Sequence, residues 1–291
     1  MGVTEWWRRI AGRGAGPTSR ASGVASRKPG TTGAAKAARS STSSRPTRAG
    51  SPTGKPGRRA EVDPSRPVVG VVVCKSGWLG AVLDRSGHGT PHLVVRPTLE
   101  DLVAHLGDVT VVGVHLPIGL PDDSRREADL EVRRLLTGRA SSAVVTTPVR
   151  DAVYAETYGE ANTLSRERTG AGVAKEAFDL RRQIVEVDRW LRQDLPFTVV
   201  EVHPEAALAV MAGTPLASRR RTAEGSAERR ETLAQAGVFV PATAPGGAVP
   251  DDVIGACAAA WSAHRVKTGQ ALSFPGQAQT FSDGLPAVIR V

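Results

Sequence analysis

The chain has 291 residues and a formal net charge of +9, but its charge and composition are unevenly distributed. Residues 1–66 hold 14 of the 38 Lys and Arg residues and three of the 29 acidic residues, so they carry +11 and residues 67–291 carry −2. The basic charge therefore indicates contact with nucleic acid only for the first segment, and it excludes a generally basic nucleic-acid-binding domain.

The segment 1–66 consists almost wholly of Gly, Ala, Ser, Thr, Pro, Arg and Lys, without apolar periodicity. Such a segment cannot bury enough apolar surface to offset the entropy lost on ordering, so we expect a disordered basic tail. Its cations could contact phosphates without sequence preference. The alternative to a functional tail is a start codon assigned too early in GC-rich DNA, which would encode a similar composition.

No stretch approaches 18 consecutive apolar residues, so we expect no membrane span. The first residues, MGVTEWWRRIAGRG, lack the apolar core of a secretory signal, and a cytoplasmic protein is expected. Cys74 and Cys257 lie in apolar runs 183 positions apart, which favours two buried free thiols over a disulfide. Trp78, Trp190 and Trp261 fall on apolar faces and are expected in the core.

Short apolar runs begin directly after the tail. Residues 68–73 form a continuous β-branched run, and residues 78–84 and 92–96 follow after short turns, which predicts an antiparallel three-strand meander. Residues 98–106 predict a helix with Thr98 as its N-cap. Residues 109–116 predict a buried strand that ends at the PIGLP turn, where proline and glycine prevent further pairing.

Helices dominate the remainder of the chain. We expect helices at 123–136 and 174–195, a strand at 197–203, helices at 204–211, 223–236 and 252–267, and a last strand at 287–291. Short helices and loops are expected over 141–172. This order predicts one α/β domain over 67–291, a mixed β-sheet of an antiparallel three-strand meander plus parallel strands, flanked by helices and enlarged by a helical insertion.

Specific motifs run in order through residues 67–291. They are VVGVVVCKSGW (68–78), VGVHLPIGLPD (112–122), READLEVRRLLTGRASSAVVTTPVR (126–150), GVAKEAFDL (172–180), VVEVHPE (199–205), PLASRRRTAEG (215–225), DDVIGACAAAW (251–261) and GLPAVI (284–289). Together they resemble an uncharacterised bacterial family, domain of unknown function 429, whose members are predicted RNase H-like nucleases. The resemblance implies an RNase H-like fold and metal-dependent hydrolysis of phosphodiester bonds in nucleic acid. In such nucleases, carboxylates on the first strand, a later strand and the last helix hold two divalent ions, usually Mg²⁺ or Mn²⁺.

The sequence departs from the family pattern where these carboxylates are expected. The family's first-strand pattern reads roughly Gly-Val-Asp-Gly-Cys, and here Val72 takes the place of the aspartate. His115 takes the place of the fourth-strand aspartate before the PIGLP turn, and Gly255 replaces the last acid of an Asp-Asp-x-x-Asp-Ala motif. The resemblance therefore implies a metal site that is reduced or lost.

Several candidate site residues remain. Glu201 and His203 lie two apart on a predicted strand and so face the same side, as metal-binding neighbours or as a strand-to-helix corner. Asp251 and Asp252 begin a helix whose dipole explains one of them, and Asp252 is the better ligand candidate. With His115 and His203 the set could bind Zn²⁺, Mn²⁺ or Fe²⁺, although a space-filling His115 in a retired site is the favoured interpretation.

Basic residues give a second set of candidates. The best phosphate contacts in the domain are Arg219, Arg220 and Arg221, together with Lys175, and a solvated loop is the more frequent alternative for such a run. A further group of arginines is expected on a solvated helix face: Arg126, Arg133, Arg134 and Arg139.

Two functions from different classes are compatible with these patterns. The first is a metal-dependent nuclease of the predicted family, with catalysis impaired or lost because of Val72 and His115, and with Glu201 and Asp252 as remaining catalytic residues. The second is a non-catalytic module that binds nucleic acid, a nucleotide or a protein. Mg²⁺ or Mn²⁺ would be the cofactor in the first case and none in the second, and the oligomeric state stays open.

Overall fold

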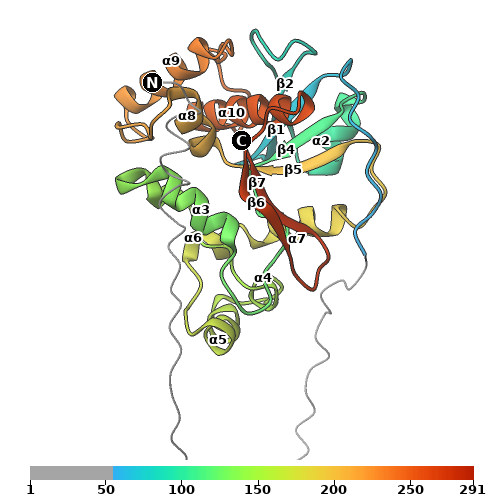
Figure 1. Cartoon of the computed structure of the whole chain (residues 1–291), viewed down its shortest axis with the longest axis vertical. Helices are drawn as coiled ribbons and strands as arrows, with labels where there is room; N and C mark the ends of the chain where they lie inside the picture. The colour runs from blue at the N-terminus through green and yellow to red at the C-terminus, as the bar shows by residue number, and fades with distance from the viewer. Residues whose placement is uncertain (1–54) are drawn as a thin grey trace, which may run out of the picture.

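The computed structural model describes residues 55–291, and its centre is a seven-stranded mixed sheet (Figure 1). The strand order is β3-β2-β1-β4-β5-β7-β6. The strands are β1 Val68–Cys74, β2 Gly77–Leu83, β3 His92–Arg96, β4 Val111–Val114, β5 Thr198–Val202, β6 Ser273–Thr280 and β7 Pro286–Arg290. β1, β4, β5 and β7 run parallel to one another, whereas β1–β2, β2–β3 and β6–β7 are antiparallel pairs. The predicted α/β fold with a meander and parallel strands is confirmed.

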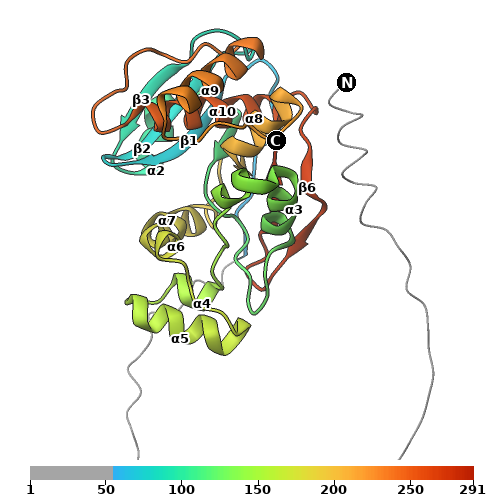
Figure 2. The same cartoon turned by 90° about the vertical axis from the view of Figure 1, so that its left-hand side faces the viewer.

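Helices cover both faces of the sheet. The long helix α10, Pro250–Lys267, crosses β1 and β2, and α8, Pro204–Ala212, and α9, Ala223–Gln235, lie beside it (Figure 2). The opposite face packs against α2, Leu99–Leu106, and α7, Arg181–Trp190. The sheet is therefore buried on both sides, which explains why β1 reads as an uninterrupted apolar run.

The contact between α10 and the sheet is unusually close because both partners are small. A Cβ on Gly70 of β1 would lie 2.0 Å from the backbone nitrogen of Ala260, and one on Gly113 of β4 would lie 3.0 Å from the carbonyl of Ala259. Small residues on the buried side of the helix allow this approach. The beginning of α10 is thereby held beside the ends of β1 and β4.

The expected helical insertion lies between β4 and β5. It contains α3 Glu127–Leu136, the 3₁₀ turn η1 Gly138–Ala143, α4 Arg150–Val153, α5 Tyr158–Thr169 and α6 Lys175–Asp179. The helices α4, α5 and α6 share a small apolar cluster of their own. A buried ion-pair network ties this cluster to the rest of the domain, because Arg150 contacts Asp188 of α7 at 2.9 Å and Asp283 at 3.5 Å.

Two elements differ from the prediction. The expected single helix over 174–195 is broken at Leu180, and the break lets the Arg181 guanidinium lie 4.3 Å from the ring centre of Phe178 and donate to the carbonyl of Ala155. The edge strand β6 was not predicted, because Pro275 and Gly276 resemble a turn. The structure accommodates them at a register shift between Phe274 and Gln279, on an edge strand where a missing donor is tolerated.

The predictions for the helix cap and the cysteines are confirmed, and those for the tryptophans are confirmed in part. Thr98 caps α2 by accepting from the backbone of Asp101, and both cysteines are free and buried, as expected. Trp78 and Trp190 lie in the core, whereas Trp261 is only partly buried. The tail prediction for residues 1–54 lies outside the described residues. Residues 57–66 form hydrogen bonds with the domain, so the folded domain begins before the predicted boundary at residue 67.

Candidate functional site

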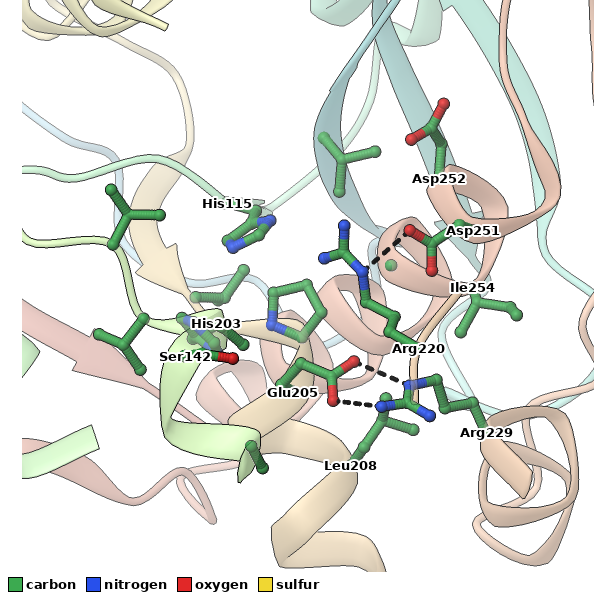
Figure 3. A pocket seen from close by; sticks show the side chains of 18 of the residues that line it. His115, Ser142, His203, Glu205, Leu208, Arg220, Arg229, Asp251, Asp252 and Ile254 are labelled. Atoms are coloured by element: carbon green, nitrogen blue, oxygen red, sulfur yellow. Dashed lines mark hydrogen bonds and ion pairs between the residues drawn. The ribbon is translucent and has the colours of Figure 1, made fainter. Parts of the chain in front are cut away.

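A cavity of about 930 Å³ opens at the carboxyl ends of the parallel strands β1, β4 and β5 (Figure 3). The beginnings of α8 and α10 and the loop before α9 line one part of it, and η1 and the residues that follow line another. Crevices outside the carboxyl ends of parallel strands are the usual ligand sites of open α/β sheets. The cavity also contains most of the sequence-predicted candidates, so it is the candidate functional site.

The three departures from the family pattern meet in this cavity. Val71 pairs with Val114, so the next residues, Val72 and His115, lie side by side on the same face. A Cβ on Gly255 of α10 would lie 3.6 Å from the Cγ1 of Val72. Where the resemblance implies three converging carboxylates, this chain has the isopropyl group of Val72, the imidazole of His115 and no side chain at Gly255.

Glu201 of β5 lines the same cavity, but its carboxylate is already bound. Its Oε2 accepts from the backbone of Ile118 at 2.7 Å and from the Arg126 guanidinium at 2.5 Å. Burial raises the pKa of Glu201 to about 7, and Arg126 only partly opposes this shift. Glu201 therefore exchanges its proton near neutral pH inside the protein.

Arg126 was expected on a solvated helix face, and this prediction is wrong. The residue is fully buried at the start of α3, where it also donates to Thr147 and lies 3.6 Å from Asp129. Burial disfavours its cation, but Glu201 and Asp129 outweigh that effect and raise the pKa of Arg126. Its proximity to acids at positions 127, 129 and 131 suggested surface pairing, and no local signal revealed the partner on β5. Arg134 does pair at the surface with Glu127, and the side chain of Arg139 lies outside the described part of the chain.

The two histidines are neighbours but serve different purposes. Their ring centres lie 5.2 Å apart in an edge-to-face arrangement. His203 caps α8, since its Nδ1 accepts from the backbone of Ala206, and it also hydrogen bonds to the backbone of Ala143. Burial lowers the pKa of both rings, and for His115 the nearby His203 and Arg220 lower it further. The lowered pKa favours the neutral form of both rings. His203 has the strand-to-helix corner role that was the alternative to metal binding.

Three further carboxylates of the cavity have partners (Figure 3). Glu205 forms a two-point ion pair with the buried Arg229, at 2.7 and 2.9 Å. Asp251 pairs with Arg220 at 3.0 Å, although burial raises the pKa of Asp251. Asp252, the preferred ligand candidate, accepts from the backbone of Val249 and so caps α10.

This donor set does not fit a two-metal centre. Among residues 55–291 there is no group of three or more His, Cys, Asp or Glu side chains arranged to hold a metal ion. Mg²⁺ and Mn²⁺ need several free carboxylate oxygens, and here Glu201, Glu205, Asp251 and Asp252 are each held by an arginine or by a backbone donor. Glu176 also lines the cavity, but it is exposed on α6. The arginines of the cavity can bind an anion, and Glu201, whose pKa burial raises to about 7, can exchange a proton near neutral pH.

The structure places the predicted phosphate contacts at two separate locations. Arg219, Arg220 and Arg221 all line the cavity, from the loop that precedes α9. Lys175 does not line it. It lies on the exposed side of α6, where it pairs with Asp179.

The fold is an α/β domain with a mixed sheet and a cavity at its strand ends. A family described as "Protein of unknown function (DUF429)" matches residues 62–280, and the chain belongs to this family. No curated protein and no solved structure matches the chain. None of the helices in the described part is both long and apolar enough to span a bilayer.

Proposed function

We propose that this domain is a non-catalytic descendant of RNase H-like metal nucleases, and that its cavity binds a phosphate-bearing ligand without a divalent metal. The antiparallel meander followed by parallel strands, with a late helix across β1, supports the RNase H-like fold that the resemblance implies. Members of the family are expected to place their acids at the ends of β1 and β4 and at the start of the late helix. The frame supports descent from a nuclease, and the residues in it support the loss of that chemistry.

One observation carries this proposal. Val72, His115 and Gly255 occupy one point of the cavity, so all three substitutions remove charge from the same place. Losing one ligand would weaken an Mg²⁺ site, but losing three leaves no carboxylate oxygen there to replace the ion's water. Retained acids such as Glu201 motivate the competing hypothesis of a rearranged nuclease site, but Glu201 is held by Arg126.

The test is calorimetric titration of Mn²⁺ into the whole protein and into a Val72→Asp/His115→Asp/Gly255→Asp variant. We expect no binding by the natural protein and binding by the triple variant, because the variant restores three converging carboxylates. The matched control replaces the same three residues by Asn, which has similar size and no charge. Thermal unfolding of each variant verifies that it is folded.

Mn²⁺ titration of the natural protein is sufficient to distinguish the two functions. Micromolar Mn²⁺ binding that Glu201→Ala abolishes would show that a metal site survives, and metal-dependent nuclease activity would then have to be measured. Such a result would contradict our proposal even if the triple variant failed to fold.

A further inference from the structure

The loop that carries the three arginines is firmly anchored. Thr222 donates to the Arg219 carbonyl from its backbone at 3.1 Å and from its hydroxyl at 2.8 Å. The backbone groups of Ala217 and Ser218 donate to the Glu228 carboxylate at 3.2 and 3.0 Å. A Cβ on Gly225 would lie 1.9 Å from the Arg219 carbonyl, so the loop rests directly on the first turn of α9.

The arginine side chains, in contrast to their backbone, are available to a ligand. All three residues are exposed, and Arg219 and Arg221 form no ion pair within residues 55–291. Arg220 points into the cavity between His115 and Asp251 (Figure 3). A fixed loop that presents three cations to a cavity differs from a solvated charge run. Its backbone is already ordered in the free protein, so a ligand that binds there causes a smaller loss of conformational entropy.

The walls of the cavity indicate the size and chemistry of the ligand. Outside the arginine loop its lining holds six carboxylates, most of them paired as described above, and an aliphatic wall that includes Val144, Val145, Leu180 and Leu208. No Phe, Tyr or Trp of the described residues lines it, whereas proteins that bind single strands stack bases on such rings. A volume of about 930 Å³ lies in the range of pockets for small organic molecules.

We propose that the cavity takes a small phosphomonoester of about mononucleotide size, with its phosphate on Arg219, Arg220 and Arg221 and its organic part against the aliphatic wall. This inference rests on the proposed function and names its ligand class. Arg220 is shared between the phosphate and Asp251, so Asp251 positions the guanidinium but also competes for it. A guanidinium is suited to this role because it can bind a carboxylate and a phosphate with separate N–H groups.

The experiment is calorimetry on the whole protein with uridine, adenosine and glycerol monophosphates, with the parent nucleosides, and with an oligonucleotide that has no terminal phosphate. We expect at least one monophosphate to bind and its unphosphorylated parent not to bind. Arg220→Ala should weaken that binding about tenfold or more, since it removes charge-assisted hydrogen bonds. Asp251→Asn should strengthen it, because Arg220 then has no competing anion.

Arg166→Ala is the matched control, because Arg166 is an exposed arginine on α5 outside the cavity, and it should leave binding unchanged. The basic tail can bind oligonucleotides on its own, so only binding that Arg220→Ala reduces is assigned to the cavity. Thermal unfolding confirms that the variants are folded.

The possible results separate this inference from the proposed function. If only the oligonucleotide binds, and Arg220→Ala weakens it, phosphate binding stands and the small-ligand class is wrong. If no phosphate compound binds in a way that depends on Arg220, both proposals are wrong. If Mn²⁺ is needed for a monophosphate to bind, the ligand class stands and the metal-free function is wrong.

Discussion

Glu201 is a buried acid that lines the cavity. Its carboxylate lies between the buried Arg126 and the backbone of Ile118, yet burial still raises its pKa from 4.5 to about 7. A protonated carboxyl at this position keeps both hydrogen-bond acceptor contacts and removes its own buried charge, but it leaves the buried Arg126 cation with Asp129, at 3.6 Å, as its ion-pair partner. The side chain thus links β5 to the loop after β4 and to the start of α3 in either protonation state.

This environment predicts a pH-dependent stability difference between the natural protein and Glu201→Gln. Below pH 4.5 the acid is protonated in both the folded and the unfolded chain, so it adds no pH dependence. Between pH 4.5 and about 7 the unfolded chain loses the proton first, so the free energy of unfolding of the natural protein falls as the pH rises. The fall amounts to roughly 3 kcal/mol at 1.36 kcal/mol per pKa unit.

Urea unfolding at several pH values measures this difference. The stability of Glu201→Gln relative to the natural protein should rise across this window and level off above it. A constant difference from pH 4 to 8 would show that Glu201 keeps an ordinary pKa beside Arg126.

At the residue scale, the sequence predicted some parts of the site and missed others for a physical reason. The positions of Val72, His115 and Gly255 were identified by comparison with a motif, and their convergence follows from strand register and the placement of α10. The ion pairs were not predictable, because Arg126 and Glu201 are 75 positions apart and no periodicity links them. A buried arginine has the same local pattern of neighbouring acids as an exposed one.

The helix α10 is the element that fixes the geometry of the cavity. It crosses β1 at Gly70, so closely that no side chain would fit at this position. This crossing places Gly255 and Asp251 beside the strand ends. Its buried face is rich in alanine, which permits close contact between the backbones of helix and strand. Any change that separates α10 from β1 should therefore alter both stability and the cavity.

Gly70→Ala should destabilise the protein by at least about 2–3 kcal/mol, because the added methyl group would overlap the backbone of α10 and force it away. Gly159→Ala in α5 is the control, since nothing lies within 4 Å of a Cβ added there. This control should be neutral or stabilising by up to about 1 kcal/mol. Denaturant unfolding measures both, and equal stability of the two variants would show that α10 can shift without cost.

Most elements were predictable because their patterns are local. The apolar runs of β1 to β4, the Thr98 cap and Pro204 at the start of α8 gave clear signals. The break at Leu180 and the strand β6 depend on tertiary contacts: Arg181 reaches the insertion, and β6 obtains its partner from β7. Local patterns also overestimated the lengths of β4 and α3. The residues that flank β4 are apolar and those before α3 are compatible with a helix, so neither boundary is visible in the sequence.

At the scale of the molecule, residues 57–66 pack against the end of α7 and against the segments that precede β4 and β5. The backbone of Gly57 donates to Leu191, and Ala60 and Leu195 are joined at 3.2 Å. The Arg59 guanidinium donates to the carbonyls of Leu191 at 2.7 Å and Gln193 at 3.0 Å. The domain boundary expected from composition was residue 67, but these contacts extend the folded unit toward residue 57.

A protein that comprises residues 55–291 should therefore be more stable than one that comprises residues 67–291. The shorter protein loses backbone hydrogen bonds, each worth about 0.5–1.5 kcal/mol net, but it also avoids the entropy cost of ordering the segment. We expect a difference of about 1–3 kcal/mol, which corresponds to roughly 2–4 °C in Tm for each kcal/mol. Scanning calorimetry measures it, and Arg59→Ala in the longer protein should reproduce part of the loss because its guanidinium makes several of the contacts. Equal Tm values would mean that the segment lies on the domain without stabilising it, and the boundary drawn from composition would then be the energetically relevant one.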